Sequence, residues 1–375
     1  MPIGILMRRC VYNKQIKITS IVFSRNLRLT NVPLLTDINR AGNCDNAPVS
    51  NESRQEIVEK ELKIDSRVKQ YAKLSKIRLT GFVTSTVFTG GYIASQSFIS
   101  ELPLIATAAI GTFLCSSSAA ALNQFLETPY DSQMRRTAIR PLVVGQVSPL
   151  ETVIFALVTG LSGVTILANF VNGLTACLGA ANLLLYSFVY TPMKRSNVAN
   201  TWVGSIVGAV PPLMGSTAVL GYVSFDAAIL ALILFSWQFP HFNALSWNLR
   251  HEYARAGYRM MSVVDPDLCK RVALRHSGFL LAYTCALPIY GSTSSLFTLC
   301  ALPLNLQFIR LSWLFHKEAD SASSRKLFKF SLIYLPAILF MLIVTQPRRS
   351  NELVSETKPS LVGIKSDDQE AGEIR

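Results

Sequence analysis

Six long apolar runs, separated by short polar segments, fill the chain from its first quarter almost to its end. They are Leu79–Ser100, Leu102–Leu126, Pro141–Met193, Ser196–Leu249, Ser277–Ile309 and Phe330–Gln346. A bilayer core of ~30 Å needs about 20 apolar residues per helix, so the third, fourth and fifth runs each have room for two spans. The pattern predicts nine spans. Helices are favoured over barrel strands, because the runs are far longer than the ~10 residues that a strand needs.

Composition supports a membrane protein of the all-α class. Half of the residues are apolar and only 16% are charged, whereas a soluble domain usually carries about 25% charged residues. This excludes a soluble globule and a disordered chain. The net charge of +13 does not indicate a nucleic-acid partner, because the basic residues lie between the apolar runs and form no single basic face. We therefore expect a polytopic bundle of about nine transmembrane helices over residues 75–346.

Basic residues between the runs predict the orientation of the bundle. The expected turns after the first, third, fifth and seventh spans contain no Lys or Arg. The basic residues of the other loops include Arg135, Arg136, Arg140, Lys194, Arg195, Arg250, Arg255, Arg259, Lys270, Arg271, Arg275, Arg310, Lys317, Arg325 and Lys326. The segment that enters the first span adds Arg67, Lys69, Lys73, Lys76 and Arg78. This one-sided distribution follows the positive-inside rule. With nine spans, the C-terminal tail (residues 347–375) falls on the opposite side.

The N-terminal segment resembles a targeting sequence. Residues 1–32 contain six basic residues, and no acidic residue precedes Asp37. Such a start favours a mitochondrial transit peptide, with a basic tail as the alternative. The basic loops would then face the matrix from the inner membrane. Residues 33–74 are expected to form a polar linker or an amphipathic helix. The seven cysteines are scattered without a CxxC pair, so neither a zinc site nor a disulfide framework is indicated.

The polar segment after the second run is the first candidate site. Asn123, Glu127 and Asp131 are spaced i, i+4 and i+8, so on a helix they share one face. Three oxygen-bearing side chains suit Mg²⁺, which is usually held by one or two carboxylates and substrate phosphates. Arginines that bind phosphate oxygens follow directly: Arg135, Arg136 and Arg140. The alternative is a solvated helix end. Pro129 is expected to interrupt the helix and to re-aim Asp131.

The segment after the sixth predicted span is the second candidate site. Trp237 and Trp247 suit the membrane interface. His241 lies in an apolar stretch, where a histidine is more often a hydrogen-bonded packing residue than a ligand. Arg250 and Glu252 could extend the first site from the opposite wall, and alone they are ordinary loop charges.

These segments resemble the intramembrane (UbiA-type) prenyltransferase superfamily, whose first signature is NxxxDxxxD. The similarity covers roughly Ser75 to Ile343, and Glu127 stands where the superfamily often has Asp. The matching elements are Asn123–Leu142, Tyr190–Arg195, Asn200–Gly204, Val210–Pro212, Pro240–Phe242, Glu252–Tyr253 and Ala256–Gly257. The Pro-His-Phe element and the second loop favour the haem-farnesylating branch. The second loop lacks the DxxxD of the quinone-type enzymes, which leaves the number of Mg²⁺ ions open.

The resemblance implies a fold, a reaction and a set of roles. It implies the transfer of farnesyl from farnesyl diphosphate to the 2-vinyl group of protohaem IX (haem B), with addition of water, to give haem O for haem A synthesis. Asn123, Glu127 and Asp131 would hold Mg²⁺ and be catalytic, while Arg135, Arg136, Arg140, Lys194 and Arg250 would bind diphosphate. Glu252 and Tyr253 would belong to a further part of the site in the second loop, the segment after the sixth span. His241 would ligate or orient the haem. The enzyme that hydroxylates haem O is an implied partner.

Two other functions remain as alternatives. A prenyltransferase acting on an aromatic quinone precursor would share the first loop. A non-enzymatic carrier or scaffold would also show nine spans, although it would not need carboxylates and arginines concentrated in the loops of one side.

Overall fold

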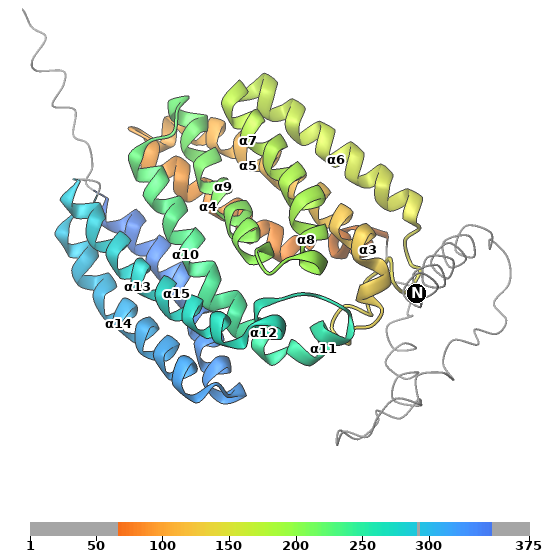
Figure 1. The fold of residues 1–375 in the computed structure, drawn as a ribbon. Coiled ribbons are helices and arrows are strands. Elements are labelled where there is room, and N and C mark those ends of the chain that lie inside the picture. Colours follow the sequence, from red (N-terminus) through yellow and green to blue (C-terminus); the bar gives the residue numbers. More distant parts are fainter. Residues whose placement is uncertain (1–66, 291–292, 347–375) are drawn as a thin grey trace, which may run out of the picture. The chain divides into compact units, whose positions relative to one another are not determined.

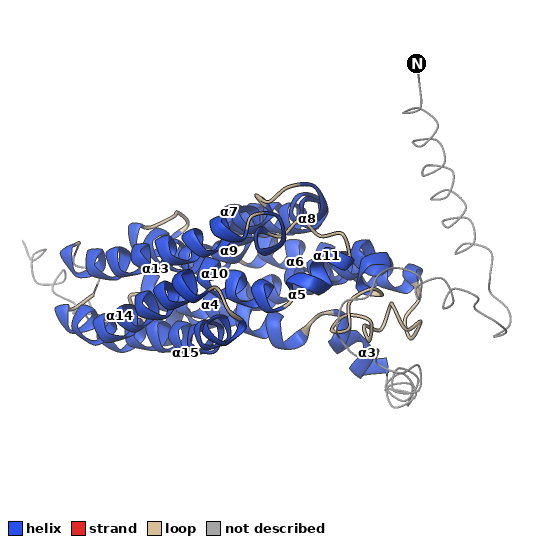
Figure 2. Cartoon of the chain, turned by 60° about the horizontal axis from the view of Figure 1, so that its bottom comes forward, coloured by secondary structure: helices blue, strands red, loops and turns tan. Residues whose placement is uncertain are grey.

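Helices follow one another almost without interruption through the described part of the chain (Figure 1). The structure, a computed structural model, describes residues 67–290 and 293–346. Every regular element in these ranges is helical, and Figure 2 shows no strand there. The all-α prediction is confirmed. The predicted transit peptide, most of the linker and the C-terminal tail lie outside the described residues.

The helices have the following bounds. They are α3 (Arg67–Leu74), α4 (Ile77–Ala94), α5 (Phe98–Asp131), α6 (Pro149–Phe170), α7 (Gly173–Leu184), the π-helical turn η2 (Leu185–Tyr190), α8 (Thr191–Ser196), α9 (Asn200–Leu220), α10 (Phe225–Asn248), α11 (Arg250–Arg255), α12 (Met261–Val264), α13 (Pro266–Ile289), α14 (Ser295–Glu318) and α15 (Ser321–Thr345). The segment α7–η2–α8 is continuous. With it, the described residues contain nine long helical segments, in agreement with the apolar runs. Eight of them are long and apolar enough to cross a membrane, and α4 falls short because it contains Arg78 and four threonines.

Helix starts follow local sequence signals. Ser148 and Glu151 form a reciprocal capping box before α6, with Pro149 in the first turn. Ser224, Asp265 and Asp320 accept hydrogen bonds from backbone N–H groups at the starts of α10, α13 and α15. These caps satisfy N–H groups that would otherwise lack partners at the membrane boundary.

Small residues bring α4 and α9 into close contact. A Cβ on Gly90 would lie 2.0 Å from the carbonyl oxygen of Pro212, and one on Gly215 would lie 2.0 Å from that of Val87. Only glycine permits these backbones to approach so closely, as is common between membrane helices. The helices α4–α9, called the N-terminal group below, carry the first candidate site.

The second group of helices consists of α10, α13, α14 and α15, called the C-terminal group below. Its largest hydrophobic cluster includes Phe239, Phe297, Phe308 and Phe315, all fully buried. A neutral polar network crosses this core: Tyr334 Oη donates to Asn305 Oδ1 (2.7 Å), and Asn305 Nδ2 donates to Thr284 Oγ1 (2.9 Å). These bonds join α15, α14 and α13, while α10 connects the group to α9 and α4.

The boundaries of the last three long helices differ from the prediction. Helix α13 begins at Pro266, ahead of the apolar run at Ser277, so Lys270, Arg271 and Arg275 lie within a helix and not in a loop. Likewise Arg310 and Lys317 belong to α14, and Arg325 and Lys326 to α15. The prediction that these residues lie in loops is wrong. Hydropathy indicates which residues lie in the apolar core of the bilayer, but it does not mark where a helix ends. A helix can continue beyond the apolar run into water with charged residues.

Candidate active site

The end of α5 brings the three oxygen-bearing residues onto one buried face. Asn123, Glu127 and Asp131 have exposed fractions of 0%, 5% and 1%. The expected interruption at Pro129 is absent, because α5 continues to Asp131. Proline cannot donate to the carbonyl of Phe125. The hydroxyl of Thr128 lies 3.1 Å from this oxygen and makes a shorter hydrogen bond (2.7 Å) to the carbonyl of Gln124. The helical spacing of the three side chains is therefore preserved.

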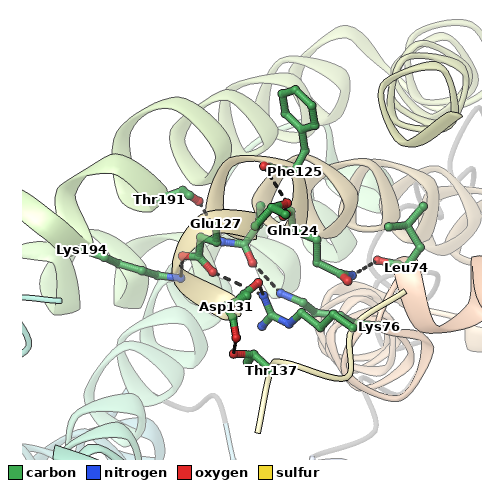
Figure 3. Close-up of polar contacts among 12 residues, drawn as sticks. Leu74, Lys76, Gln124, Phe125, Glu127, Asp131, Thr137, Thr191 and Lys194 are labelled. Atoms are coloured by element: carbon green, nitrogen blue, oxygen red, sulfur yellow. Dashed lines mark hydrogen bonds and ion pairs between the residues drawn. The ribbon is translucent and has the colours of Figure 1, made fainter. Parts of the chain in front are cut away.

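Three cations from three different segments meet these side chains (Figure 3). Lys76 Nζ donates to Asn123 Oδ1 (2.7 Å), and Lys194 Nζ donates to Glu127 Oε1 (2.7 Å). Arg140 pairs with Asp131 and lies 3.6 Å from Glu127 Oε2. Two carboxylates thus face three cations. This set of six residues, Lys76, Asn123, Glu127, Asp131, Arg140 and Lys194, is called the charged cluster below, and its excess of positive charge suits an anionic ligand.

Lys76 is the member of the cluster that the sequence did not reveal. It lies between α3 and α4 in a left-handed conformation (φ 50°), which is uncommon for a residue with a side chain. Gln124 Nε2 holds this corner by donating to the carbonyl of Leu74 (2.6 Å). Burial, followed by the neighbouring Arg140 charge, lowers the pKa of Lys76 to about 7. The protein surroundings therefore stabilise the charged form of Lys76 only weakly at neutral pH.

Lys194 is placed by an irregular helical segment. The π-helical turn η2 precedes α8, and Thr191 Oγ1 donates to the carbonyl of Tyr186 within it (2.9 Å). The same hydroxyl accepts from Asn123 Nδ2 (3.2 Å), which ties α8 to α5. The ammonium of Lys194 also lies 4.6 Å from the centre of the Tyr190 ring. Such π-helical turns often occur at functional sites.

The second loop covers the charged cluster through aromatic side chains. Tyr258 is buried and lies edge-on to Tyr130 and Tyr253, with ring centres 6.0 and 5.8 Å apart. Burial, reinforced by the Glu127 charge, raises the pKa of Tyr258. The loop is fixed to α8 because the backbone N–H of Arg259 donates to the carbonyl of Lys194 (2.7 Å). Tyr258 was not identified from the sequence, since nothing in its spacing indicated a contact with α5.

Other predicted site residues lie apart from the charged cluster. Arg135 and Arg136 are exposed. Arg250 donates to the carbonyl of Trp247 and lies over its ring. Glu252 Oε2 is buried and has no hydrogen-bond partner among the described residues.

His241 is on α10, and its side chain contacts α15. Its Nδ1 is 2.8 Å from Ser331 Oγ, and its ring stacks on Trp237 with centres 4.6 Å apart. These contacts fit a hydrogen-bonded packing residue, and Nε2 has no hydrogen-bond partner in the part of the chain that the structure describes. The structure therefore does not bring His241 into the charged cluster.

The donor set of the charged cluster fits a hard cation that shares its ligands with a substrate. Among the described residues, no three His, Cys, Asp or Glu side chains gather in a metal-binding group. Two carboxylates and one amide oxygen are too few for a closed protein cage, but they suit Mg²⁺ when phosphate oxygens complete its octahedron. The arrangement can therefore bind a metal–diphosphate complex.

The family model and the sequence relatives that match this chain point to the same family. The UbiA prenyltransferase family matches residues 83–333. The mitochondrial protohaem IX farnesyltransferase of Homo sapiens is 47% identical over 301 residues, which cover 80% of this chain and 68% of that protein. The corresponding protein of Arabidopsis thaliana is 37% identical, over 75% of this chain and 66% of that protein. The chain thus spans about two thirds of the length of these relatives.

Comparisons of the structure give the same fold at low identity. A digeranylgeranylglyceryl phosphate synthase matches with a TM-score of 0.65 and 16% identity, covering 74% of this chain and 98% of that one. A UbiA homologue from Archaeoglobus fulgidus, solved with GPP and Mg²⁺, matches with a TM-score of 0.52 and 11% identity, covering 74% and 100% of the two chains. Proteins with this fold therefore include one that binds a prenyl diphosphate with Mg²⁺.

Proposed function

Since the chain belongs to the UbiA prenyltransferase family, we propose that it transfers the farnesyl group of farnesyl diphosphate to the 2-vinyl group of protohaem IX, with addition of water. The products are haem O and diphosphate. The observation that carries this proposal is the 47% identity, over 80% of the chain, to a protein named protohaem IX farnesyltransferase. The charged cluster adds an independent chemical reason, because a buried site with excess positive charge fits a diphosphate.

The cations of the charged cluster bind the leaving group. Breaking the allylic C–O bond places negative charge on diphosphate, and fixed cations in a buried site stabilise that charge strongly. Lys76, Lys194 and Arg140 are already held in position by Asn123, Glu127 and Asp131. Arg140 offers the planar donors that bind phosphate oxygens in pairs. Arg135 and Arg136, exposed just beyond α5, attract the anion from solvent.

The same oxygens are suited to Mg²⁺. Glu127, Asp131 and the amide oxygen of Asn123 would hold the ion, which would neutralise charge on the diphosphate. These oxygens now accept from Lys76, Lys194 and Arg140, which would bind phosphate oxygens in their place when the metal and the diphosphate are present. Glu252, with a buried and unpartnered carboxylate oxygen, is the candidate for a further ligand in the second loop, next to Tyr253.

His241 is the candidate contact for haem. Its hydrogen bond with Ser331 uses Nδ1, so Nε2 is the nitrogen that remains for an iron or a propionate. We expect a His241→Ala variant to change the visible spectrum of bound haem without changing the affinity for farnesyl diphosphate. An unchanged haem spectrum would remove His241 from the site.

The proposed location is the mitochondrial inner membrane, with the charged cluster facing the matrix. Both relatives are named as mitochondrial proteins, and the basic loops follow the positive-inside rule. Residues 1–32 remain a predicted transit peptide. Both haem B and haem O partition into lipid, so a membrane enzyme that hydroxylates haem O is the expected recipient of the product.

A product assay tests the proposal against a quinone-type reaction. Purified protein in detergent is incubated with Mg²⁺ and labelled farnesyl diphosphate, together with either haem B or an aromatic acid. We expect a haem whose mass has increased by one farnesyl group and one water, and no prenylated aromatic acid. Prenylation of the aromatic acid alone would refute the proposed acceptor.

A further inference from the structure

Six exposed cations surround the basic end of the C-terminal group. They are Arg271 and Arg275 on α13, Arg310 on α14, and Arg325, Lys326 and Lys329 on α15. Within the described residues, none of the six forms an ion pair or a hydrogen bond, although the exposed carboxylates of Asp267 and Glu318 lie at the same end of α13 and α14. The hydrogen bond and charge of Lys270, followed by the Arg271 charge, lower the pKa of Asp267. Together they are called the cationic belt. Figure 1 shows α13, α14 and α15 side by side at one edge of the bundle, with α14 outermost.

Three members of the cationic belt lie at similar distances from the basic ends of their own helices. Arg275 is nine residues from the start of α13, Arg310 is eight from the end of α14, and Lys329 is eight from the start of α15. At 1.5 Å per residue, each lies roughly 12–14 Å inside the basic end of its helix. One turn further into the bundle, each helix exposes a large apolar side chain: Phe279, Leu306 and Ile333. A common boundary between charge and lipid-facing surface therefore crosses the three helices.

The apolar segments beyond this boundary are short. They are His276–Ile289, Ser295–Ile309 and Phe330–Thr345. About 15 residues of helix cover roughly 22 Å, whereas the hydrocarbon core is ~30 Å thick. In α5, by contrast, the charge-free segment runs from Leu102 to Leu126. In a bilayer, segments this short would leave the cationic belt at the level of lipid phosphates, which long basic side chains would reach by extending toward the interface.

We propose that the cationic belt binds the headgroups of anionic phospholipids. Charge complementarity supports a lipid, because phosphate oxygens are the partners that unpaired guanidinium and ammonium groups select at a membrane surface. The exposed apolar residues one turn away support a lipid over an acidic protein, since the same helix faces must contact acyl chains. The interaction would anchor the C-terminal group in a thinned, anionic annulus of the bilayer. It does not depend on the charged cluster or on the proposed reaction.

Trp313 provides a local reporter for the experiment. It is 49% exposed, one turn from Arg310 on α14, and Lys317 lies 5.3 Å from its ring. The full-length protein is reconstituted in nanodiscs of phosphatidylcholine containing a small fraction of either brominated phosphatidylglycerol or brominated phosphatidylcholine. Tryptophan quenching then reports which lipid gathers near α14. A Trp313→Phe variant identifies the part of the signal that comes from this position.

We expect about a two- to five-fold enrichment of phosphatidylglycerol over phosphatidylcholine at Trp313, weakened by 0.5 M salt. The Arg275→Gln/Arg310→Gln variant should lose most of this enrichment, whereas Arg275→Lys/Arg310→Lys should keep it. The matched control, Arg255→Gln/Arg259→Gln, removes two exposed cations from the second loop and should also keep it. Equal quenching by the two lipids in the unmodified protein would overturn the proposal, and it is the result expected if the cationic belt binds an acidic protein. An equal loss of phosphatidylglycerol enrichment in the Arg255→Gln/Arg259→Gln control would also overturn it.

Discussion

The charged cluster and the polar network of the C-terminal group are both buried between helices, but the cluster consists mainly of ionisable side chains and the network of neutral ones. The cluster contains two carboxylates and three cations, with Glu127 and Asp131 almost inaccessible. The C-terminal network uses only neutral groups, from Tyr334, Asn305 and Thr284. Neutral hydrogen bonds are sufficient to join membrane helices. Buried charges cost free energy even when they are paired, so their presence indicates a function other than stability.

The largest expected effect comes from removing one charge of the cluster without changing its shape. Asp131→Asn keeps the volume of the side chain but removes the partner of Arg140 and a proposed Mg²⁺ ligand. We expect turnover to fall by about 10²- to 10³-fold, as when other preorganised charges are lost. Turnover is measured per folded molecule, with helix content checked by circular dichroism. Near-normal turnover would show that the carboxylate has no catalytic role.

Two arginines that follow α5, Arg140 and Arg136, allow the effect of a buried cation on substrate binding to be compared with that of an exposed one. Arg140 pairs with Asp131, whereas Arg136 is exposed. Charged hydrogen bonds contribute about 1.5–3 kcal/mol, so Arg140→Ala should raise the KM for farnesyl diphosphate by roughly 10- to 100-fold. Arg136→Ala, acting only from solvent, should raise it by about two- to three-fold. The KM for haem should not change in either variant. An equal rise in the KM for haem and for farnesyl diphosphate would contradict the assignment of these arginines to diphosphate binding.

Lys76 predicts a pH dependence of diphosphate binding. Its pKa of about 7 means that the ammonium is present at pH 6 and largely absent at pH 8.5. An anion binds the charged form, so binding above pH 7 must take up a proton, and affinity should fall by up to about tenfold per pH unit. Titration calorimetry with farnesyl thiodiphosphate in Mg²⁺-free buffer measures this change.

The Lys76→Arg variant is the control for this titration, because a guanidinium stays charged across the range. Its affinity should vary less with pH than that of the unmodified protein. The same pH dependence in both proteins would show that another group titrates.

The smallest effect is expected in the neutral network. Tyr334→Phe removes the hydrogen bond to Asn305 and leaves the core volume almost unchanged. Such bonds between membrane helices average about 0.6 kcal/mol, so we expect a slightly lower midpoint of thermal unfolding and unchanged kcat and KM. A loss of turnover that exceeds the loss of folded protein would show that the neutral network also serves the reaction and does not only join helices.

The sequence predicted the features that depend on local periodicity. Apolar runs indicated the spans, because a bilayer requires a fixed length of apolar helix. The i, i+4, i+8 spacing placed Asn123, Glu127 and Asp131 on one face, because this geometry repeats within a single helix.

Features that depend on contacts between distant segments could not be predicted. Lys76 reaches Asn123 from the corner before α4, which Gln124 helps to hold. Tyr258 approaches Tyr130 from a loop that is bonded to α8 through Arg259 and Lys194. The interruption expected at Pro129 does not occur: α5 continues to Asp131, and the hydroxyl of Thr128 shares its hydrogen bond between the carbonyls of Gln124 and Phe125. None of these long-range or compensating contacts has a signature in spacing or hydropathy.

The most direct test of the account is an experimental structure with farnesyl thiodiphosphate and Mn²⁺ in place of Mg²⁺, located by its anomalous scattering. We predict a Mn²⁺ peak within about 2.0–2.3 Å of carboxylate oxygens of Glu127 or Asp131. The diphosphate should lie among Lys76, Lys194 and Arg140. A diphosphate bound elsewhere, with the charged cluster unchanged and its ion pairs intact, would contradict the central claim that this buried charge is maintained to bind the substrate.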